Sequence, residues 1–207
     1  MLKPSQAQDR ADALISQAKK AGADAADAIY VCDASTQVQR LGNLEDVERS
    51  EGEEIGLRVF VGKRSATVSS SDMDPEILSS LVGRAIDMAK EAPEDQYAGL
   101  APEELLLKSD PHPIEGDDGQ NPEPELLREL ALKAEDAARS VKGVTNSEGG
   151  GANAGRTIVA LATSHGFSGA YSTSGYSISA SVIAGQGDGM ERDYAYDSAR
   201  FLEDLQS

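Results

Sequence analysis

The sequence predicts an α+β fold, in which amphipathic helices pack on a largely antiparallel β-sheet. Two observations support this fold class. Three segments repeat apolar residues at helical spacing, whereas the chain after Val144 alternates apolar and small polar residues with a period of two. Glycine-rich turns separate the alternating segments, which is typical of strands joined by hairpins.

Two helices are predicted in the first half of the chain. The first covers residues 5–21, and Ser5 is available as its N-cap. The second starts after Asp74, with Pro75 at the first helical position, and ends before Pro93. The apolar residues of each helix form one stripe, which predicts burial against a sheet.

Four strands are predicted between these two helices. Their ranges are 28–32, 36–40, 55–61 and 65–70. The last two are expected to form a hairpin, with Gly62 supplying the positive φ of the turn. The acidic residues 41–54 fit either a strand or a helix, and both alternatives stay open.

The second half of the chain predicts a third helix, over residues 125–141, and then an antiparallel meander. Residues 176–182 alternate apolar side chains with serines, which predicts a strand with one buried and one polar face. Residues 158–164 are more uniformly apolar and are expected to be covered on both faces. A final helix is predicted over residues 198–205.

An acidic, proline-rich segment separates the two halves. Residues 93–125 hold six of the eight prolines, ten acidic residues and a single basic one. Such a composition buries little, so this segment is expected to be a long surface connection or partly disordered. The predicted division is residues 1–92, a connection over 93–124, and a second part over 125–207.

Charge and composition limit the classes of function. The net charge of −17 disfavours nucleic acid and anionic membrane surfaces. Cys32 is the single cysteine and suits a reducing compartment, and no apolar run is long enough to cross a bilayer. We expect a soluble, cytoplasmic protein. Because the sequence stops inside a predicted helix, we also expect it to be a piece of a longer protein.

The residue patterns argue against catalysis and metal binding by this chain. The two histidines, His112 and His165, cannot supply the ligand set of a zinc site. Ser168 follows a turn that faintly resembles a nucleophile elbow, but the expected strand–turn–strand context is wrong for one. The glycines at 185–189 predict a flexible turn, and the acidic residues 117–118 predict a solvated linker. No catalytic residue, bound cofactor or metal is expected.

Aromatic residues gather in the last quarter of the chain, beside strands of small polar residues. Core packing is the simplest interpretation, and we favour it for Tyr176. The alternative is a sheet face or an open edge that receives an extended peptide or a partner. The candidate residues for such a surface are His165, Phe167, Tyr171, Tyr176, Arg192, Tyr194 and Tyr196.

Several phrases of the sequence, in order, resemble the PmbA/TldE branch of the TldD/PmbA proteins. They are IGLRVFVG at 55–62, SSSD at 69–72, PEDQYAGL at 93–100, TNSEG at 145–149, ATSHGF at 162–167 and GDGMERDY at 187–194. The resemblance implies an N-terminal half of the TldD/PmbA type, followed in the family by a mostly β second half. In that family the TldD branch carries a zinc helix with the pattern His-Glu-x-x-x-His. This sequence has no such pattern.

The resemblance implies a metal-free subunit of a peptidase complex. Its expected partners are a TldD-like subunit, to which any zinc would belong, and unfolded or modified peptides. The family's older description, modulator of DNA gyrase, implies no direct contact with nucleic acid. Two alternatives stay open: a stand-alone metallopeptidase whose zinc motif lies beyond residue 207, and a binding module without peptidase activity.

Overall fold

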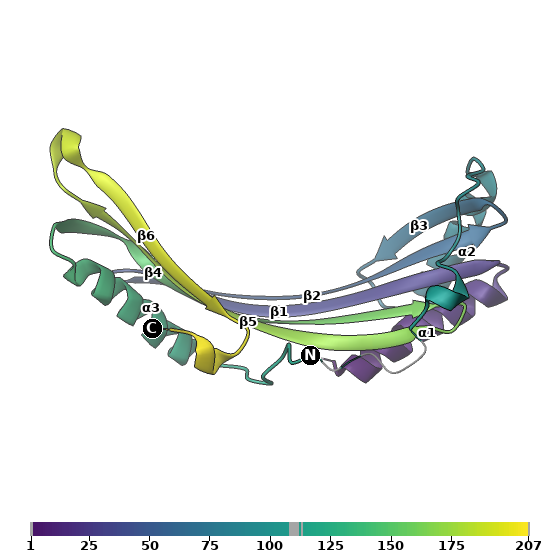
Figure 1. Ribbon diagram of the computed structural model, residues 1–207, viewed down its shortest axis with the longest axis horizontal. Helices are drawn as coiled ribbons and strands as arrows, with labels where there is room; N and C mark the ends of the chain where they lie inside the picture. The colour runs from purple at the N-terminus through teal and green to yellow at the C-terminus, as the bar shows by residue number, and fades with distance from the viewer. Residues whose placement is uncertain (1, 108–111, 113, 207) are drawn as a thin grey trace. The chain divides into compact units, whose positions relative to one another are not determined.

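A computed structural model describes residues 2–107, 112 and 114–206 of the protein (Figure 1). It contains three α-helices and six strands in one antiparallel sheet with the order β3-β2-β1-β4-β5-β6. The elements are α1 (Pro4–Lys20), β1 (Ala25–Leu41), β2 (Leu44–Val61), β3 (Arg64–Ser70), α2 (Pro75–Glu91), α3 (Pro124–Ser140), β4 (Val144–Thr163), β5 (Ser168–Ala184) and β6 (Glu191–Ala199). The predicted α+β class is therefore confirmed.

The chain divides into two compact units, each built from three segments of sequence. The first unit comprises Met1–Asp33, Gly52–Ile114 and Thr157–Ser172, within which residues 1, 108–111 and 113 are outside the described part of the chain. The second comprises Ala34–Glu51, Glu115–Arg156 and Thr173–Ser207. Strands β1, β2, β4 and β5 contribute to both units. The predicted division at residues 93–124 stays a prediction.

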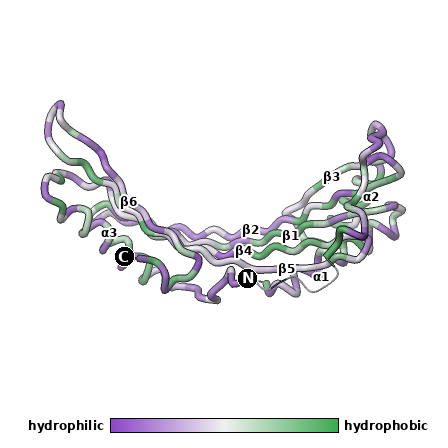
Figure 2. Tube along the Cα trace, viewed as in Figure 1, coloured by the Kyte–Doolittle hydropathy of each residue, from purple (hydrophilic) through white to green (hydrophobic). Residues whose placement is uncertain are grey.

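In the first unit, α1 and α2 pack on one face of the sheet. Leu14 and Ile15 of α1 and Ile86 of α2 join Tyr30 of β1 and Ile158 of β4 in one buried cluster. Figure 2 shows the hydrophobic character of β1 and β4 where they pass through this unit. The apolar stripes that predicted both helices are the surfaces that form this core.

The two helices begin differently from one another. Asp74 caps α2 as predicted, because its carboxylate accepts the backbone N–H of Glu76 at 2.8 Å, with Pro75 at the first helical position. The predicted cap of α1 is wrong. Helix α1 starts at Pro4, and Lys3 takes the N-cap position, where its N–H donates to Oε1 of Gln6 at 2.8 Å.

The strands of the first unit alternate buried and exposed residues, even where the sequence predicted burial on both faces. Gly62, with φ of 58°, turns β2 into β3 as predicted. The expectation that residues 158–164 are covered on both faces is wrong. Ala160 and Ala162 are buried, but Leu161 between them is 40% exposed, because the helices of this core pack on one face only.

In the second unit, α3 covers the sheet face to which Val38, Ala152 and Ile178 belong. Residues 41–54, which fitted either a helix or a strand, form a tight turn at Gly42 and then the first part of β2. The predicted helix over 198–205 is wrong. Strand β6 continues to Ala199, which pairs with Tyr176, and only a short 3₁₀ turn, Leu202–Asp204, follows.

The first two of the three consecutive glycines of β4 are packed too closely for side chains. Gly149 has φ of 110°, and a Cβ atom there would lie 2.2 Å from the carbonyl oxygen of Arg40. At Gly150 a Cβ atom would lie 2.3 Å from the carbonyl oxygen of Ala131 on α3. Glycine therefore allows β4 to approach both β1 and α3 closely. Among the described residues, no helix is both long and apolar enough to cross a membrane.

Candidate functional site

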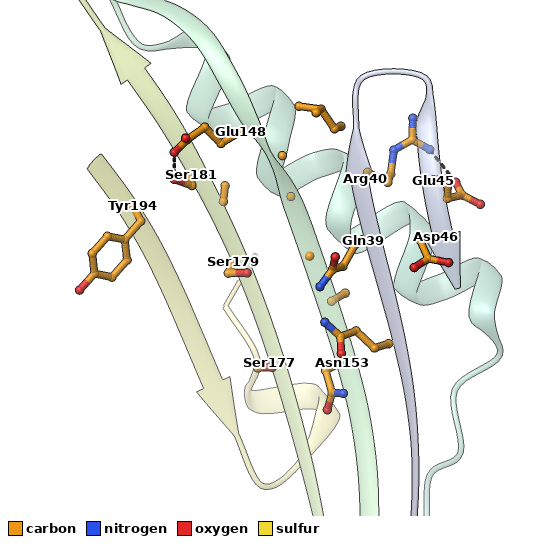
Figure 3. Close-up of a pocket in the computed structure, with 17 residues that line it drawn as sticks. Gln39, Arg40, Glu45, Asp46, Glu148, Asn153, Ser177, Ser179, Ser181 and Tyr194 are labelled. Atoms are coloured by element: carbon orange, nitrogen blue, oxygen red, sulfur yellow. Dashed lines mark hydrogen bonds and ion pairs between the residues drawn. The ribbon is translucent and has the colours of Figure 1, made fainter. Parts of the chain in front are cut away.

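The second unit has a polar groove on the face of its sheet opposite α3, which we call the open face (Figure 3). Alternation along the strands places Val38 and Ile178 toward α3 and their neighbours on the open face. The groove encloses about 750 Å³. Side chains from five strands line it, among them Gln37, Gln39, Asp46, Asn153, Ser179 and Tyr194.

The floor of the groove consists of small residues from two neighbouring strands. Ser177, Ser179 and Ser181 of β5 lie beside Gly151 of β4. A Cβ atom on Gly151 would lie only 3.2 Å from Oγ of Ser179, so the glycine leaves that hydroxyl uncovered by a neighbouring side chain. Hydroxyl groups both donate and accept hydrogen bonds, so this floor can bind either polar group of a peptide backbone.

A carboxylate with two partners forms one wall of the groove. Oε2 of Glu148 accepts the Ser181 hydroxyl at 2.9 Å (Figure 3). Its Oε1 accepts Nη2 of Arg192 at 2.5 Å. These two interactions, the Ser181 hydrogen bond first, lower the pKa of Glu148 below its usual value. Glu148 is therefore ionised at neutral pH, and its charge is balanced by Arg192.

Strand β2 contributes two consecutive carboxylates on the opposite side, of which Glu45 turns toward α3 and Asp46 toward the groove. Glu45 accepts Nη1 of Arg40 at 3.1 Å and Nε of Arg128 at 2.6 Å, and the hydrogen bond from Arg128 is the main reason that its pKa is lowered. Arg40 also donates to the carbonyl oxygen of Gly42 at 2.9 Å. Asp46 lines the groove without a hydrogen bond or ion pair to any described residue.

Two tyrosines of the edge strand β6 lie on the same open face. Tyr194 pairs with Ser181 and Tyr196 with Ser179, so their side chains share the face of the serine hydroxyls. The two rings stack with centroids 6.4 Å apart, and the residues are 70% and 72% exposed. Tyr194 forms the rim of the groove on this side.

The structure separates the seven residues that the sequence suggested for a peptide-facing or partner-facing surface. Arg192, Tyr194 and Tyr196 lie together on the open face. Tyr176 lies on the α3 side, is 3% exposed, and donates its hydroxyl to Asp118 at 2.7 Å, which confirms the core interpretation of this residue. The remaining three, His165, Phe167 and Tyr171, belong to the first unit at the β4–β5 turn.

His165 stabilises the turn in which it lies. Its Nε2 is 2.8 Å from the carbonyl oxygen of Ala101, so Nε2 carries a proton and donates it. Nδ1 is 3.0 Å from the hydroxyl of Thr163. Both ring nitrogens of His165 thus have local partners. The Ser168 hydroxyl forms hydrogen bonds with α1, donating to Asp12 at 2.8 Å and accepting from Gln8 at 2.9 Å.

The potential metal ligands and the cysteine of the described residues are dispersed. No group of three or more His, Cys, Asp or Glu side chains within the described part of the chain is placed to hold a metal ion. His112 is exposed, and Cys32 is a buried core residue of the first unit, as predicted. Ser168 begins β5 directly after the turn that follows β4, which confirms the expected strand–turn–strand context.

Sequence reasoning missed the residues of the groove that lie outside the meander. Gln37 and Gln39 flank the buried Val38, so the period of two already placed them on a polar face. What the sequence lacked was the pairing of β1 with β4, which brings Gln37 and Gln39 into one groove with Asn153. Asp46 belongs to the acidic segment 41–54, for which the sequence did not decide between a strand and a helix.

Models of two protein-family domains match most of this chain. A model described as PmbA/TldA metallopeptidase domain 1 matches residues 36–89, and one described as the PmbA/TldA metallopeptidase central domain matches residues 117–207. The groove draws on both matched regions. The chain belongs to the PmbA/TldD family.

Two curated relatives carry the PmbA name, in agreement with the PmbA/TldE branch. Metalloprotease PmbA of Escherichia coli O157:H7 is 36% identical over 174 residues, which are 81% of this chain and 37% of that protein. The Metalloprotease PmbA homolog of Haemophilus influenzae is 32% identical over 191 residues, 92% of this chain and 42% of that protein. The chain thus spans well under half the length of either relative.

Three solved structures share the fold. A protein named as a modulator of DNA gyrase from Bacteroides thetaiotaomicron matches all of this chain and 47% of its own, with a TM-score of 0.88 and 19% identity. A protein of the same description from Thermotoga maritima matches 96% of this chain and 44% of its own, with a TM-score of 0.78 and 15% identity. TldE from Thermococcus kodakarensis matches 95% of this chain and 44% of its own, with a TM-score of 0.74 and 18% identity.

Proposed function

We propose that this chain belongs to the metal-free subunit of a TldD/TldE-type peptidase complex that degrades unfolded peptides or trims modified peptide precursors. The observation that carries the proposal is the polar groove on the open face. Its described lining offers hydroxyl and amide side chains, which can hydrogen-bond a peptide. In this proposal the chain binds peptide, and a TldD-like partner supplies the chemistry.

The lining of the groove suits a peptide backbone. The amides of Gln37, Gln39 and Asn153 each offer a donor and an acceptor, as a peptide group does. Contacts to the backbone are independent of peptide sequence, which is what a peptidase for unfolded chains requires. An extended peptide is also a substrate whose own hydrogen-bonding groups are unpaired.

We propose that zinc belongs to the partner, and the donor set of this chain supports that proposal. The side chains that could ligate zinc are dispersed among the described residues, and the sequence has no His-Glu-x-x-x-His pattern. We propose that the complex works in the cytoplasm, where a single unpaired cysteine such as Cys32 is tolerated.

The test is reconstitution of the complex. The protein and a TldD-like protein are purified separately, mixed, and assayed for association by sedimentation and for cleavage of an unfolded peptide. The expected result is a stable complex that cleaves, zinc that co-elutes with the partner, and no cleavage by this subunit alone. Absence of association together with absence of joint cleavage would contradict the proposal.

A second candidate is a stand-alone metallopeptidase. It is favoured by the curated relatives, both named metalloproteases, of which this chain spans only 37% and 42%. In this case the zinc ligands belong to the part of the protein that this chain does not span. Elemental analysis of the full-length protein decides between the two, since stoichiometric zinc with chelator-sensitive cleavage in the absence of a partner supports the second candidate alone.

A further inference from the structure

We propose that the polar groove selects extended peptide segments that carry a lysine or arginine side chain. The inference rests on the proposed function, because it names the kind of peptide that the groove receives. Three features of the described residues support it: the width of the groove across the sheet, the sign of the charge that is left unpaired, and the exposed tyrosine at the rim.

The width of the groove fits a short extended peptide. Its lining runs from Asp46 on β2, across β1, β4 and β5, to Tyr194 on β6. Neighbouring strands lie about 4.8 Å apart, so the five strands span roughly 19 Å. An extended chain advances about 3.3 Å per residue, so roughly six residues lie across the groove.

The charge that remains unpaired in the groove is negative. The arginines at and beside the groove are all committed to carboxylates. On the open face Arg192 pairs with Glu148 at 2.5 Å. On the α3 side Arg40 and Arg128 pair with Glu45 at 3.1 and 2.6 Å, and Arg128 also pairs with Glu125. Asp46 lines the groove and makes no ion pair with any described residue. The whole chain carries −17, so the surrounding field also attracts cations and repels acidic peptides.

The rim tyrosine offers a second, independent attraction for a cation. Tyr194 is 70% exposed and stacks on Tyr196, so part of its ring surface is open to a ligand. A lysine ammonium or an arginine guanidinium over such a ring is held by the ring quadrupole. A peptide with basic side chains can therefore contact the aspartate wall and the tyrosine rim of the same groove.

The experiment measures binding of three labelled peptides to the purified protein by fluorescence anisotropy. The peptides alternate alanine with lysine, with glutamine or with glutamate, and are otherwise identical. We expect the lysine peptide to bind at least about tenfold more tightly than the glutamate peptide at low salt, with the difference reduced at high salt. Equal binding of the three peptides would overturn the inference.

Substitutions locate the binding in the groove. We expect Asp46→Asn to weaken the lysine peptide about threefold and Tyr194→Ala to weaken it by a similar factor, without an equal effect on the glutamine peptide. Asp136→Asn, at an exposed position of α3, makes the same charge change outside the groove, and Tyr97→Ala removes a tyrosine that is 85% exposed in the first unit. Equal effects of the groove variants and their controls would refute the assignment.

Three further measurements separate the possible failures. Ser179→Arg places a long cationic side chain on the floor and is expected to weaken the lysine peptide more than about tenfold, with folding verified by circular dichroism. If spermine displaces the peptide at equal charge concentration, the groove is a general cation site and the inference fails.

If the reconstituted complex cleaves peptides without preferring basic ones, the inference fails while the proposed function survives. If no cleavage occurs, anisotropy still tests the groove.

Discussion

The carboxylate of Glu135 on α3 accepts the hydroxyl of Ser147 on β4 at 2.9 Å, with both residues buried. The same carboxylate accepts the backbone N–H of Gly42 at 3.1 Å, in the turn between β1 and β2. One side chain that is 2% exposed thus joins a helix to two parts of the sheet within the second unit. Buried carboxylates are stable only when such partners satisfy them.

Replacement of Glu135 is therefore expected to destabilise the protein. Glu135→Ala should lower the free energy of unfolding by about 3 kcal/mol, because it removes hydrogen bonds to a charged acceptor and leaves buried donors unpaired. Urea denaturation measures the change. Glu129→Ala, at an exposed position of the same helix, is the matched control and is expected to change stability by less than about 0.5 kcal/mol. A similar loss in both variants would contradict this role of Glu135.

A methyl group at Gly150 is expected to disrupt the contact between β4 and α3. Gly150→Ala should cost about 3 kcal/mol or more, because the added carbon would overlap the carbonyl oxygen of Ala131. At Gly175 of β5 the same addition meets no atom within 4 Å. Gly175→Ala should therefore be nearly neutral in thermal unfolding, and equal melting temperatures for the two variants would refute the packing argument.

Asp118 is expected to contribute stability that depends on pH. Burial alone would raise its pKa, but hydrogen bonds from the backbone N–H of Leu202 and the hydroxyl of Tyr176 lower the pKa below its usual value. Because the folded pKa is the lower one, this contribution is present above about pH 4 and is lost as the pH falls through the folded pKa. Asp118→Asn should cost about 2 kcal/mol at neutral pH and less in acid.

Urea denaturation across this pH range tests the Asp118 prediction. Asp188→Asn is a suitable control, since it makes the same change at an exposed turn position. A loss for Asp118→Asn that stays constant from neutral pH to strong acid would show that the carboxylate does not act through its ionised form.

Tyr30 is expected to give the opposite dependence at alkaline pH. Burial, and then the hydrogen bond to Glu53 at 2.5 Å, raise the pKa of its hydroxyl above the usual value of about 10. A raised folded pKa means that the contribution is complete below about pH 10 and is lost as the pH rises through the folded pKa. Tyr30→Phe should cost about 1 kcal/mol at neutral pH, with a smaller difference in strong base.

Guanidinium denaturation at neutral and alkaline pH measures this difference for Tyr30→Phe. The control is Tyr97→Phe, because Tyr97 is 85% exposed and its hydroxyl group has no described hydrogen bond. The assignment would be wrong if the two variants lost the same stability at every pH.

Local patterns were enough to predict the elements whose partners are near in sequence. Asp74 and Pro75 marked the start of α2 because a capping carboxylate and a proline act within one turn. Ser177, Ser179 and Ser181 marked the polar face of β5, because alternation is a property of the strand itself.

The errors arose where a distant residue determines the structure. Residues 198–205 have helical spacing, but the N–H of Leu202 donates to Asp118 at 2.8 Å, and Ala199 pairs with Tyr176. Neither partner is visible in the local pattern. The groove was missed for the same reason: it forms where β1 lies beside β4, and the residues that these two neighbouring strands contribute are more than a hundred positions apart in the chain.

The first unit combines segments that are far apart in the sequence, and this affects how the protein folds during synthesis. Its core includes Ile158, Ala160 and Ala162, which the ribosome adds long after the segment that ends at Ile114. At about 5–20 residues per second, roughly two to nine seconds separate the two events. During that interval the edge of β1 that receives β4 has no partner, and such an edge is prone to pair with other chains. The nascent chain is therefore expected to need chaperone protection until β4 has emerged.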